Sequence, residues 1–375
     1  MDAMTIAGLF ICILCLLYLL YLGAEKLLAR RYRRSLLHVI QVNGIRGKSS
    51  TVRLIDAGLR AGGFRVVSKS TGTLPMILHT DGREEEIRRR APANIREQLS
   101  LLAAAHREGA QIAVCECMAI SPELQRASQQ MLQADIALIT NVRLDHTDVM
   151  GATREEICAS LLHMAPEKGL LITGEEDMLP FMQAAMKKRQ GCAKLALPDA
   201  AGYPGIPDFP ENIALALAAC EAAGVSRAAA LKGMESVRRD PYAFERLQWG
   251  HTVFLNAFSA NDVQSTRTLY EKSGEKAPLI LILNNRKDRP ARALEMSRLA
   301  RLLPFREIWI LGEQKGLMQR LLRRQNPSVP LRRFDRAEDI PLDFSEPRVL
   351  LGAGNIKGQG EALTLRIRRR AKEVE

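Results

Sequence analysis

Hydrophobic and polar residues alternate along the chain in short blocks, which predict strands and helices in turn. Apolar runs typical of buried parallel strands fall at residues 38–43, 65–69, 111–117, 135–142 and 170–173. The helical spacing of apolar positions predicts helices at residues 49–61, 94–108 and 211–223. This order predicts an α/β fold with a doubly wound, mostly parallel sheet.

The alternation pauses at residues 238–241, Arg-Arg-Asp-Pro, and then resumes toward the end of the chain. Further strands are predicted at residues 252–256, 279–283, 307–311 and 349–351. A short polar stretch with proline is typical of a domain boundary. We therefore expect a larger domain over residues 35–240 and a smaller α/β C-terminal domain over residues 241–375.

The first apolar run differs from the others because it is long enough to cross a membrane. Residues 5–24 carry no charge, and about 20 such residues span a bilayer as a helix. Lys26 and the arginines within residues 30–34 follow it, so the positive-inside rule predicts an N-terminus outside and a cytoplasmic catalytic body. A cleaved signal peptide is the alternative, but Asp2 and the lack of a basic start favour a retained, single-pass anchor over residues 1–34.

Charge and cysteine content refine this picture only slightly. The net charge is +12, and a basic cluster at residues 366–372 either contacts an anionic surface or substrate or is a solvated tail. No nucleic-acid partner is expected. The seven cysteines form no pair of CxxC units, which argues against a zinc site and fits a reducing compartment.

The segment Val-Asn-Gly-Ile-Arg-Gly-Lys-Ser-Ser at residues 42–50 predicts a phosphate-binding loop, or P-loop, because it lies between a strand and a helix. Lys48 is expected to reach the β- and γ-phosphates of ATP, and the Ser49 hydroxyl to bind Mg²⁺. A Gly-rich turn with a surface lysine is the alternative. The expected ATP-binding residues of the loop are Gly44, Arg46, Gly47, Lys48, Ser49 and Ser50.

Two later positions are candidate metal ligands. Glu116 ends the apolar strand 111–117, where a buried charge is costly unless a cation or another partner compensates it. We expect it to bind Mg²⁺, while a salt-bridged carboxylate or a helix cap is the alternative. His146 follows the strand 135–142 within Asn-Val-Arg-Leu-Asp-His-Thr-Asp, which resembles the NxxxDHxD pattern of Mur ligases, whose histidine binds a second metal ion.

The chain resembles the membrane-anchored ligase subunits of bacterial poly-γ-glutamate (capsule) synthases, a branch of the Mur ligase superfamily. Its loop is shorter than the general P-loop pattern, with Gly44 in place of a glycine at Val42, as in the GTxGKT/S loop of Mur ligases. The matching segments extend through nearly the whole chain and are NGIRGKS (43–49), STGT (70–73), PANIREQ (92–98), ECMAISPELQ (116–125), NVRLDHTDVMG (141–151), FPENIALAL (209–217), FLNAFSAND (254–262) and GAGNIKG (352–358).

This resemblance implies an ATP-dependent amide ligase that activates a γ-carboxylate as an acyl phosphate and joins glutamate to poly-γ-glutamate. It implies two Mg²⁺ ions, with Mn²⁺ as an alternative, and a multispan membrane subunit as partner; a homo-oligomer stays open. Carried over by position, Asn212 contacts adenine and Arg246 approaches the γ-phosphate, while Asn261 and Asp262 lie in a hinge segment near the nucleotide.

The chain also departs from the Mur ligase pattern. Leu161 stands where many members have a carbamylated lysine, with no lysine before Lys168, so no such residue is assigned. Ala257 replaces the aspartate of the hinge pattern, which puts ribose contact there in question, and the nearby Asn256 is not assigned.

The acceptor site is the least defined part of the prediction. A basic cluster after the strand 279–283 either contacts the acceptor substrate or is a surface loop, and its residues are Arg286, Asp288 and Arg289.

Two other functions stay open at this point. The same chemistry would serve another amino acid or a short peptide, and the P-loop alone would also serve a membrane-anchored regulatory or transport ATPase. The surroundings of His146 argue against that ATPase, because a motor does not need a second metal site.

Overall fold

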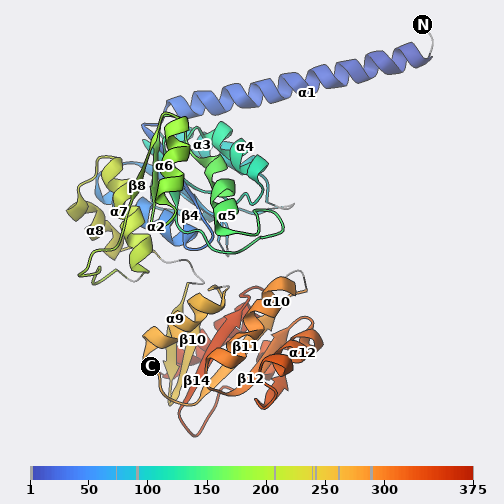
Figure 1. Cartoon of the computed structure of the whole chain (residues 1–375), viewed down its shortest axis with the longest axis vertical. Coiled ribbons are helices and arrows are strands. Elements are labelled where there is room, and N and C mark those ends of the chain that lie inside the picture. The colour runs from blue at the N-terminus through green and yellow to red at the C-terminus, as the bar shows by residue number, and fades with distance from the viewer. Residues whose placement is uncertain are drawn as a thin grey trace. The chain divides into compact units, whose positions relative to one another are not determined.

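The computed structural model describes residues 3–72, 74–89, 93–206, 208–238, 240, 243–260, 262–287 and 290–374. Contacts divide the chain into two compact units, Met1–Arg238 and Arg239–Glu375. Each unit is built around its own β-sheet (Figure 1). The two sheets correspond to the two α/β domains that the alternation of strands and helices predicts.

Within its described residues the N-terminal unit contains an eight-stranded sheet. Its spatial order is β4 (Glu84–Glu86), β3 (Met76–Leu78), β2 (Val66–Ser70), β5 (Ile112–Glu116), β1 (His38–Asn43), β6 (Ile136–Ile139), β7 (Leu170–Thr173) and β8 (Cys192–Leu195). The strands from β2 to β8 in this order run parallel, while β3 and β4 add an antiparallel edge. The predicted doubly wound, mostly parallel sheet is confirmed.

Helices cover both faces of this sheet because alternate residues of its strands are apolar toward opposite sides. One face packs against α2 (Lys48–Ala61) and α7 (Pro210–Ala222), and α8 (Arg227–Glu235) packs on these two helices. The other packs against α3 (Glu97–Arg107), α4 (Pro122–Leu132), α5 (Arg154–Leu161), the 3₁₀ turn η1 (Leu162–Met164) and α6 (Leu179–Lys188).

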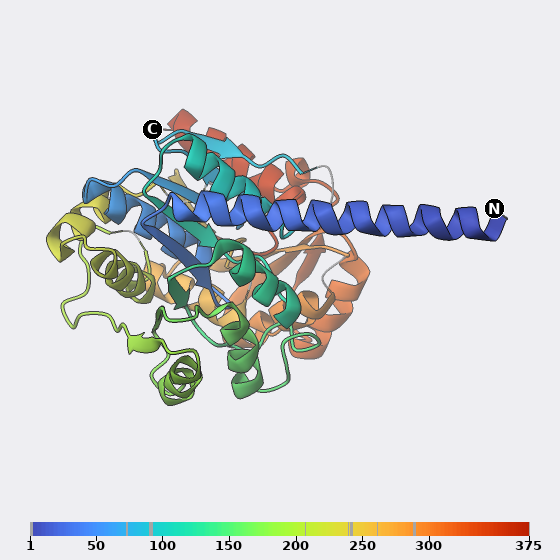
Figure 2. The same ribbon diagram turned by 90° about the horizontal axis from the view of Figure 1, so that it is seen from above.

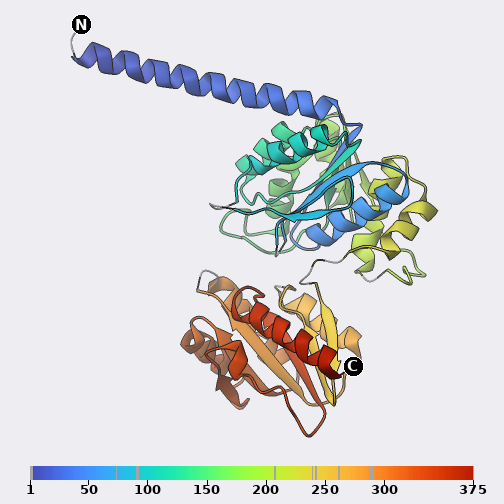
Figure 3. The same ribbon diagram turned by 180° about the vertical axis from the view of Figure 1, so that it is seen from behind.

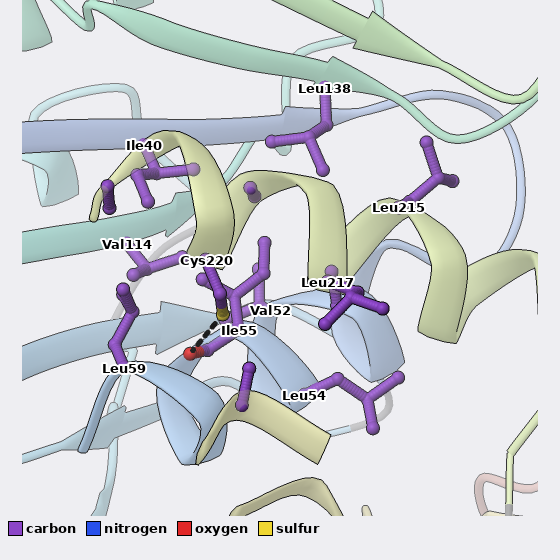
Figure 4. Packing of buried hydrophobic residues seen from close by; sticks show 14 of the residues in the cluster. Ile40, Val52, Leu54, Ile55, Leu59, Val114, Leu138, Leu215, Leu217 and Cys220 are labelled. Carbon is purple, nitrogen blue, oxygen red and sulfur yellow. Dashed lines mark hydrogen bonds between the residues drawn. The ribbon is translucent and has the colours of Figure 1, made fainter. Parts of the chain in front are cut away.

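The core between the sheet and α2 shows how this packing is made (Figure 4). Ile40 and Val114 lie opposite each other on neighbouring strands, and both are fully buried against Ile55 of α2. Cys220 of α7 donates its thiol to the Ile55 carbonyl at 3.6 Å. Gly58 allows the two helices this close approach, since a Cβ there would lie 2.7 Å from the Cys220 sulfur.

The first helix, α1 (Ala3–Arg34), extends well beyond the sheet of the N-terminal unit (Figure 1). Its residues 7–34 include a window with mean hydropathy 2.4 and no buried residue, so it is long and apolar enough to cross a membrane. Only its C-terminal part packs against the protein, where Ala29 is buried. Helix α1 is therefore a candidate membrane anchor whose last turns belong to the folded unit.

The C-terminal unit contains a second sheet over its described residues, with β9 as an antiparallel edge and the other strands parallel. The spatial order is β13 (Leu331–Arg333), β12 (Phe305–Gly312), β11 (Leu279–Asn285), β14 (Arg348–Gly354), β10 (Thr252–Asn256) and β9 (Glu245–Trp249). Its helices are α9 (Val263–Ser273), α10 (Pro290–Ser297), α11 (Leu299–Leu302), α12 (Lys315–Gln325), the turn η2 (Ala337–Asp339) and α13 (Gln359–Val374).

The structure contains every strand that the apolar runs predict, with small differences at the ends. The strand 135–142 was predicted too long, since β6 ends at Ile139. Thr140 and Asn141 leave the ladder because their side chains bond to the P-loop. The strands β3, β4 and β13 were not predicted because each is only three residues long, and β8 and β9 because polar or charged residues interrupt their short apolar pattern.

This packing predicts which thiols react in the folded chain. Burial raises the pKa of the thiols of Cys115 and Cys158, each to about 12, whereas Cys192 is exposed. Because the thiolate is the nucleophile, iodoacetamide should label Cys192 and spare the buried thiols, which are Cys115, Cys117, Cys158 and Cys220. Peptide mass spectrometry measures this labelling on a variant with serine at Cys12 and Cys15, the two cysteines in the apolar run of α1. Denatured chain should label throughout, and rapid native labelling of Cys115 would contradict this packing.

Candidate active site

The P-loop lies at the carboxyl end of β1, between the ends of β5 and β6. Its Gly44 and Gly47 have φ angles of 121° and 83°, in the left-handed region that favours glycine. Gly47 is also the N-cap residue of α2, so the free N–H groups of this helix begin where the loop ends. The local chain therefore offers backbone donors for phosphate, as the motif predicts.

Thr140 and Asn141, just after β6, clamp this loop in place. The Thr140 hydroxyl donates to the Arg46 carbonyl at 2.6 Å, and the Asn141 amide donates to the same oxygen at 3.0 Å. In return, the Arg46 N–H donates to Asn141 Oδ1 at 3.0 Å. A Cβ on Gly44 would lie 2.1 Å from Thr140 Oγ1, so only glycine allows this contact.

Lys48 is held over the loop that precedes it. Its ammonium donates to the carbonyls of Gly44 at 2.7 Å and Ile45 at 3.3 Å. Burial lowers the pKa of Lys48 from its ordinary value, and the negative charge of Glu116 opposes that shift. The phosphate oxygens of a nucleotide would be stronger acceptors for this ammonium than neutral carbonyls.

Glu116 joins three segments at the carboxyl edge of the sheet. Glu116 is the last residue of β5 and is only 4% exposed. Its Oε2 accepts hydrogen bonds from the Ser49 hydroxyl at 2.8 Å and from the Thr71 backbone N–H at 2.5 Å. The structure thus brings together Ser49 and Glu116, the two residues expected to bind Mg²⁺.

This donor set fits Mg²⁺ in the way nucleotide-dependent enzymes usually hold it. The described residues contain no group of three or more His, Cys, Asp or Glu side chains able to enclose a metal ion. Mg²⁺ seldom needs such a cage, since it typically takes one or two protein oxygens together with phosphate and water. Ser49 and Glu116 supply that number.

His146 lies near the loop but is joined to it through a neighbour. Its backbone N–H donates to Asp145 Oδ1 at 2.8 Å, and its ring Nε2 lies 4.0 Å from the same oxygen. Asp145 in turn pairs with Arg46 at 3.0 Å. His146 has a φ of 49°, a conformation uncommon for histidine. Its binding of a second metal ion stays a prediction.

Asn212, expected to contact adenine, lies directly against the P-loop. A Cβ on Gly47 would come 2.4 Å from Asn212 Oδ1, so the start of α7 and the loop touch. The Asn212 amide donates to Asp208 at 2.8 Å, which fixes its orientation. Ser50 lies in the first turn of α2, beside the same loop.

The remaining predicted residues belong to the C-terminal unit. Arg246 lies on the edge strand β9 and pairs with Glu275 at 2.7 Å. Asp262 caps α9 by accepting the Ser265 N–H at 2.7 Å, and Arg286 directly follows β11. Three predicted residues lie outside the described ranges: Asn261, Asp288 and Arg289.

Two buried side chains to which the sequence analysis assigned no role are also candidates for ligand contacts. The Ser70 hydroxyl and both polar atoms of the Asn256 amide have no hydrogen-bond partner among the described residues, although both residues are 0% exposed. They end β2 and β10, each at the carboxyl edge of its sheet. Buried polar groups are nearly always bonded, so both are candidates to meet a ligand.

Leu161, at the position of the family's carbamylated lysine, is buried in the apolar core of the N-terminal unit. Lys168 precedes β7 and so lies at the amino edge of the sheet, opposite the P-loop.

Both units match known protein families. Residues 42–198 match the Mur ligase middle domain, and residues 243–370 match the family described as poly-gamma-glutamate synthase CapB C-terminal domain. The chain is 31% identical to PGA synthase CapB of Bacillus subtilis over 365 residues, covering 88% of this chain and 89% of that protein. It is 29% identical to the capsule biosynthesis protein CapB of Bacillus anthracis over 385 residues, covering 94% and 82% respectively.

Solved structures share the fold at low sequence identity. The Escherichia coli FolC complex with ADP superposes with a TM-score of 0.68 at 19% identity, covering 93% of this chain and 94% of that one. MurF from Acinetobacter baumannii superposes with a TM-score of 0.67 at 16% identity, covering 92% and 80%.

The contact between Gly44 and Thr140 predicts a steric effect on nucleotide binding. In Gly44→Ala the added methyl would collide with Thr140 and keep a disfavoured φ, so calorimetry should show ATP binding weakened roughly 5- to 150-fold, the equivalent of 1–3 kcal/mol of local strain. Gly316→Ala is the matched control, since nothing lies within 4 Å of its Cβ position on α12. Equal ATP affinity in Gly44→Ala and wild type would show that the loop does not hold the nucleotide.

The hydrogen bonds from Thr140 and Asn141 to the P-loop predict a smaller effect on ATP binding when the Thr140 hydroxyl alone is removed. Thr140→Val keeps the shape but loses the bond to the Arg46 carbonyl, so the Kd for ATP should rise roughly 2- to 12-fold, in line with 0.5–1.5 kcal/mol for one hydrogen bond. Thr140→Ser keeps the hydroxyl and should bind ATP nearly as wild type does. If Ser and Val variants weaken binding equally, the methyl packing rather than the hydroxyl matters.

Proposed function

The chain belongs to the CapB family of poly-γ-glutamate synthases, and on that premise we propose that it joins glutamate to a growing poly-γ-glutamate chain through a γ-carboxylate. It is an ATP-dependent amide ligase with a Mur ligase fold. The observation that best supports the proposal is the meeting of Lys48, Ser49 and Glu116 at one edge of the sheet.

The chemistry requires that a carboxylate be activated before an amine can attack it. Transfer of the γ-phosphoryl group of ATP to the carboxylate forms an acyl phosphate and releases ADP. The amine of the next amino acid then attacks the acyl carbon, phosphate leaves, and the nitrogen loses a proton to give the amide. Both reactants of the first step are anionic, so positive charge and backbone donors must offset their repulsion.

The residues of the N-terminal unit suit this task. The Lys48 ammonium and the N–H groups at the start of α2 would hold the phosphates, and Asn212 would lie beside the nucleotide at the P-loop. Ser49 and Glu116 would hold Mg²⁺, which when bound offsets the charge on the phosphate oxygens. Thr71 keeps the Glu116 carboxylate oriented through its backbone N–H.

The apolar helix α1 supports a location at the membrane. We propose that it crosses the bilayer with its N-terminus outside, because Lys26 and the arginines of residues 30–34 follow the apolar run. The catalytic body would then be cytoplasmic, beside a multispan membrane subunit. The net charge of +12 would help retain an anionic polymer.

The decisive experiment incubates the full-length chain, in membranes with its partner subunits, with ATP, Mg²⁺ and radiolabelled L- or D-glutamate. Glutamate-dependent ADP release together with labelled polymer is the expected result. Glu116→Gln should lower kcat/KM roughly 10²- to 10³-fold, the usual loss on removing one preorganised charge contact, while Glu123→Gln on the exposed start of α4 should not.

Other outcomes would decide against the proposal. Amide formation only with another amino acid or a peptide would keep the ligase and change its substrate. ADP release that does not depend on glutamate and yields no amide would favour a regulatory or transport ATPase instead.

A further inference from the structure

The last turns of α1 are packed against α3 and α4 rather than joined to them by a linker (Figure 3). The ring of Tyr32 lies 5.1 Å from that of His106, and Arg33 pairs with Asp135 at 3.1 Å. Ala29, between them and the apolar run, is only 4% exposed. Seen from above, the helix continues straight from this contact toward the N-terminus (Figure 2). The C-terminal end of α1 is therefore packed into the N-terminal unit through its own side chains.

Arg96 contacts α1 nearer the N-terminus of that helix than Tyr32 and Arg33 do. Its guanidinium lies 3.1 Å from the Glu25 carboxylate and 5.1 Å above the ring of Tyr21. Tyr21 and Glu25 are one helical turn apart and so share a face of α1. The Glu25 side chain is 12% exposed, in the first charged turn after the apolar run. The Arg96 side chain is 45% exposed, so water screens the ion pair in part, while its contact with the Tyr21 ring adds to the pairing with Glu25.

The next residue, Glu97, connects the same turn of α3 to the sheet. Its carboxylate lies 3.2 Å from the ammonium of Lys69 on β2 and accepts two bonds from Arg89 at 2.8 and 3.0 Å. Lys69 is fully buried and also donates to Gln98 at 2.8 Å. A buried charge of this kind is very costly to leave unpaired. The ion pair between Glu97 and Lys69 therefore holds the start of α3 in a fixed position relative to the end of β2.

Strand β2 leads directly to the candidate metal carboxylate. Two residues beyond Lys69, the Thr71 N–H donates to Glu116 Oε2, which also accepts the Ser49 hydroxyl. A contiguous set of contacts thus runs from Tyr21 and Glu25 to Glu116.

We propose that Arg96 is a positioning residue that couples the docking of α1 to the orientation of Glu116. With α1 docked, Arg96 holds the first turn of α3, and Glu97 and Lys69 hold the end of β2, so that Thr71 stays bonded to Glu116. When α1 is displaced, this edge of the sheet loosens and Glu116 is less well placed for its metal. The proposal rests on the proposed function, because it assumes that the site around Glu116 is the ligase active site.

Hydrogen–deuterium exchange on the full-length, metal-free chain in detergent micelles tests the coupling without turnover. In Arg96→Ala, and in Glu25→Ala on the other side of the contact, residues 66–72 and the start of α3 should exchange roughly 2- to 30-fold faster, a range typical of coupling through packed networks. Arg96→Lys should restore wild-type exchange because it can still pair with Glu25. Arg107→Ala, exposed at the far end of α3, is the matched control and should change nothing.

A second readout measures the Mg²⁺ concentration at half-maximal ADP release. It should rise roughly 2- to 30-fold in Arg96→Ala and Glu25→Ala, with little change in kcat at saturating Mg²⁺. Unchanged exchange in residues 66–72, or faster exchange spread evenly over the whole N-terminal unit, would overturn the coupling. If wild type makes no glutamate amide, the proposed function fails, but the exchange result still decides the role of Arg96.

Discussion

The close contact between the P-loop and the end of β6 is the constraint on which the site depends. In a parallel sheet the strands β5, β1 and β6 are neighbours, so their carboxyl ends meet at one edge. Gly44 lies so near Thr140 that no side chain fits between them. The loop is therefore held in one conformation by the end of its neighbour strand, next to the free N–H groups at the start of α2.

The arrangement of the N-terminal unit also depends on buried charged side chains. Lys48, Glu116 and Lys69 are all largely removed from water, and each is held by hydrogen bonds or an opposite charge. Such groups contribute little net stability, since desolvation offsets most of their attraction. They do restrict the arrangements the site can adopt, and a preorganised site spends less energy on reorganisation during phosphoryl transfer. The same contacts extend from the site to α3 and, in the coupling we propose, through Arg96 to α1.

The sequence predicted the longer, mostly apolar strands well and the short or polar ones poorly. Runs such as residues 38–43 and 170–173 coincide with β1 and β7, because a strand buried on both faces is built mostly from apolar side chains. The strand β4 is three glutamates, and no hydrophobic pattern marks it. Local motif chemistry singled out the P-loop and Glu116, and the family resemblance singled out Asn212; in the structure Glu116 and Asn212 both lie against the loop or the first turn of α2. Neither gave a role to Ser70, because burial without a hydrogen-bond partner among the described residues cannot be read from a serine in the sequence.

What the sequence determined by itself is what short stretches of chain can encode. A glycine-rich turn between strand and helix, an uncharged run long enough to span a bilayer, and the alternation of elements are all readable within a few residues. The tertiary structure decided which distant polar groups meet. Ser49 and Glu116 are 67 positions apart, Thr71 and Glu116 are 45 apart, and Arg46 and Thr140 are 94 apart. The order of the strands in the sheet sets these pairings. That order depends on how the whole sheet buries its two faces, and the hydrophobic pattern of a short segment carries no information about it.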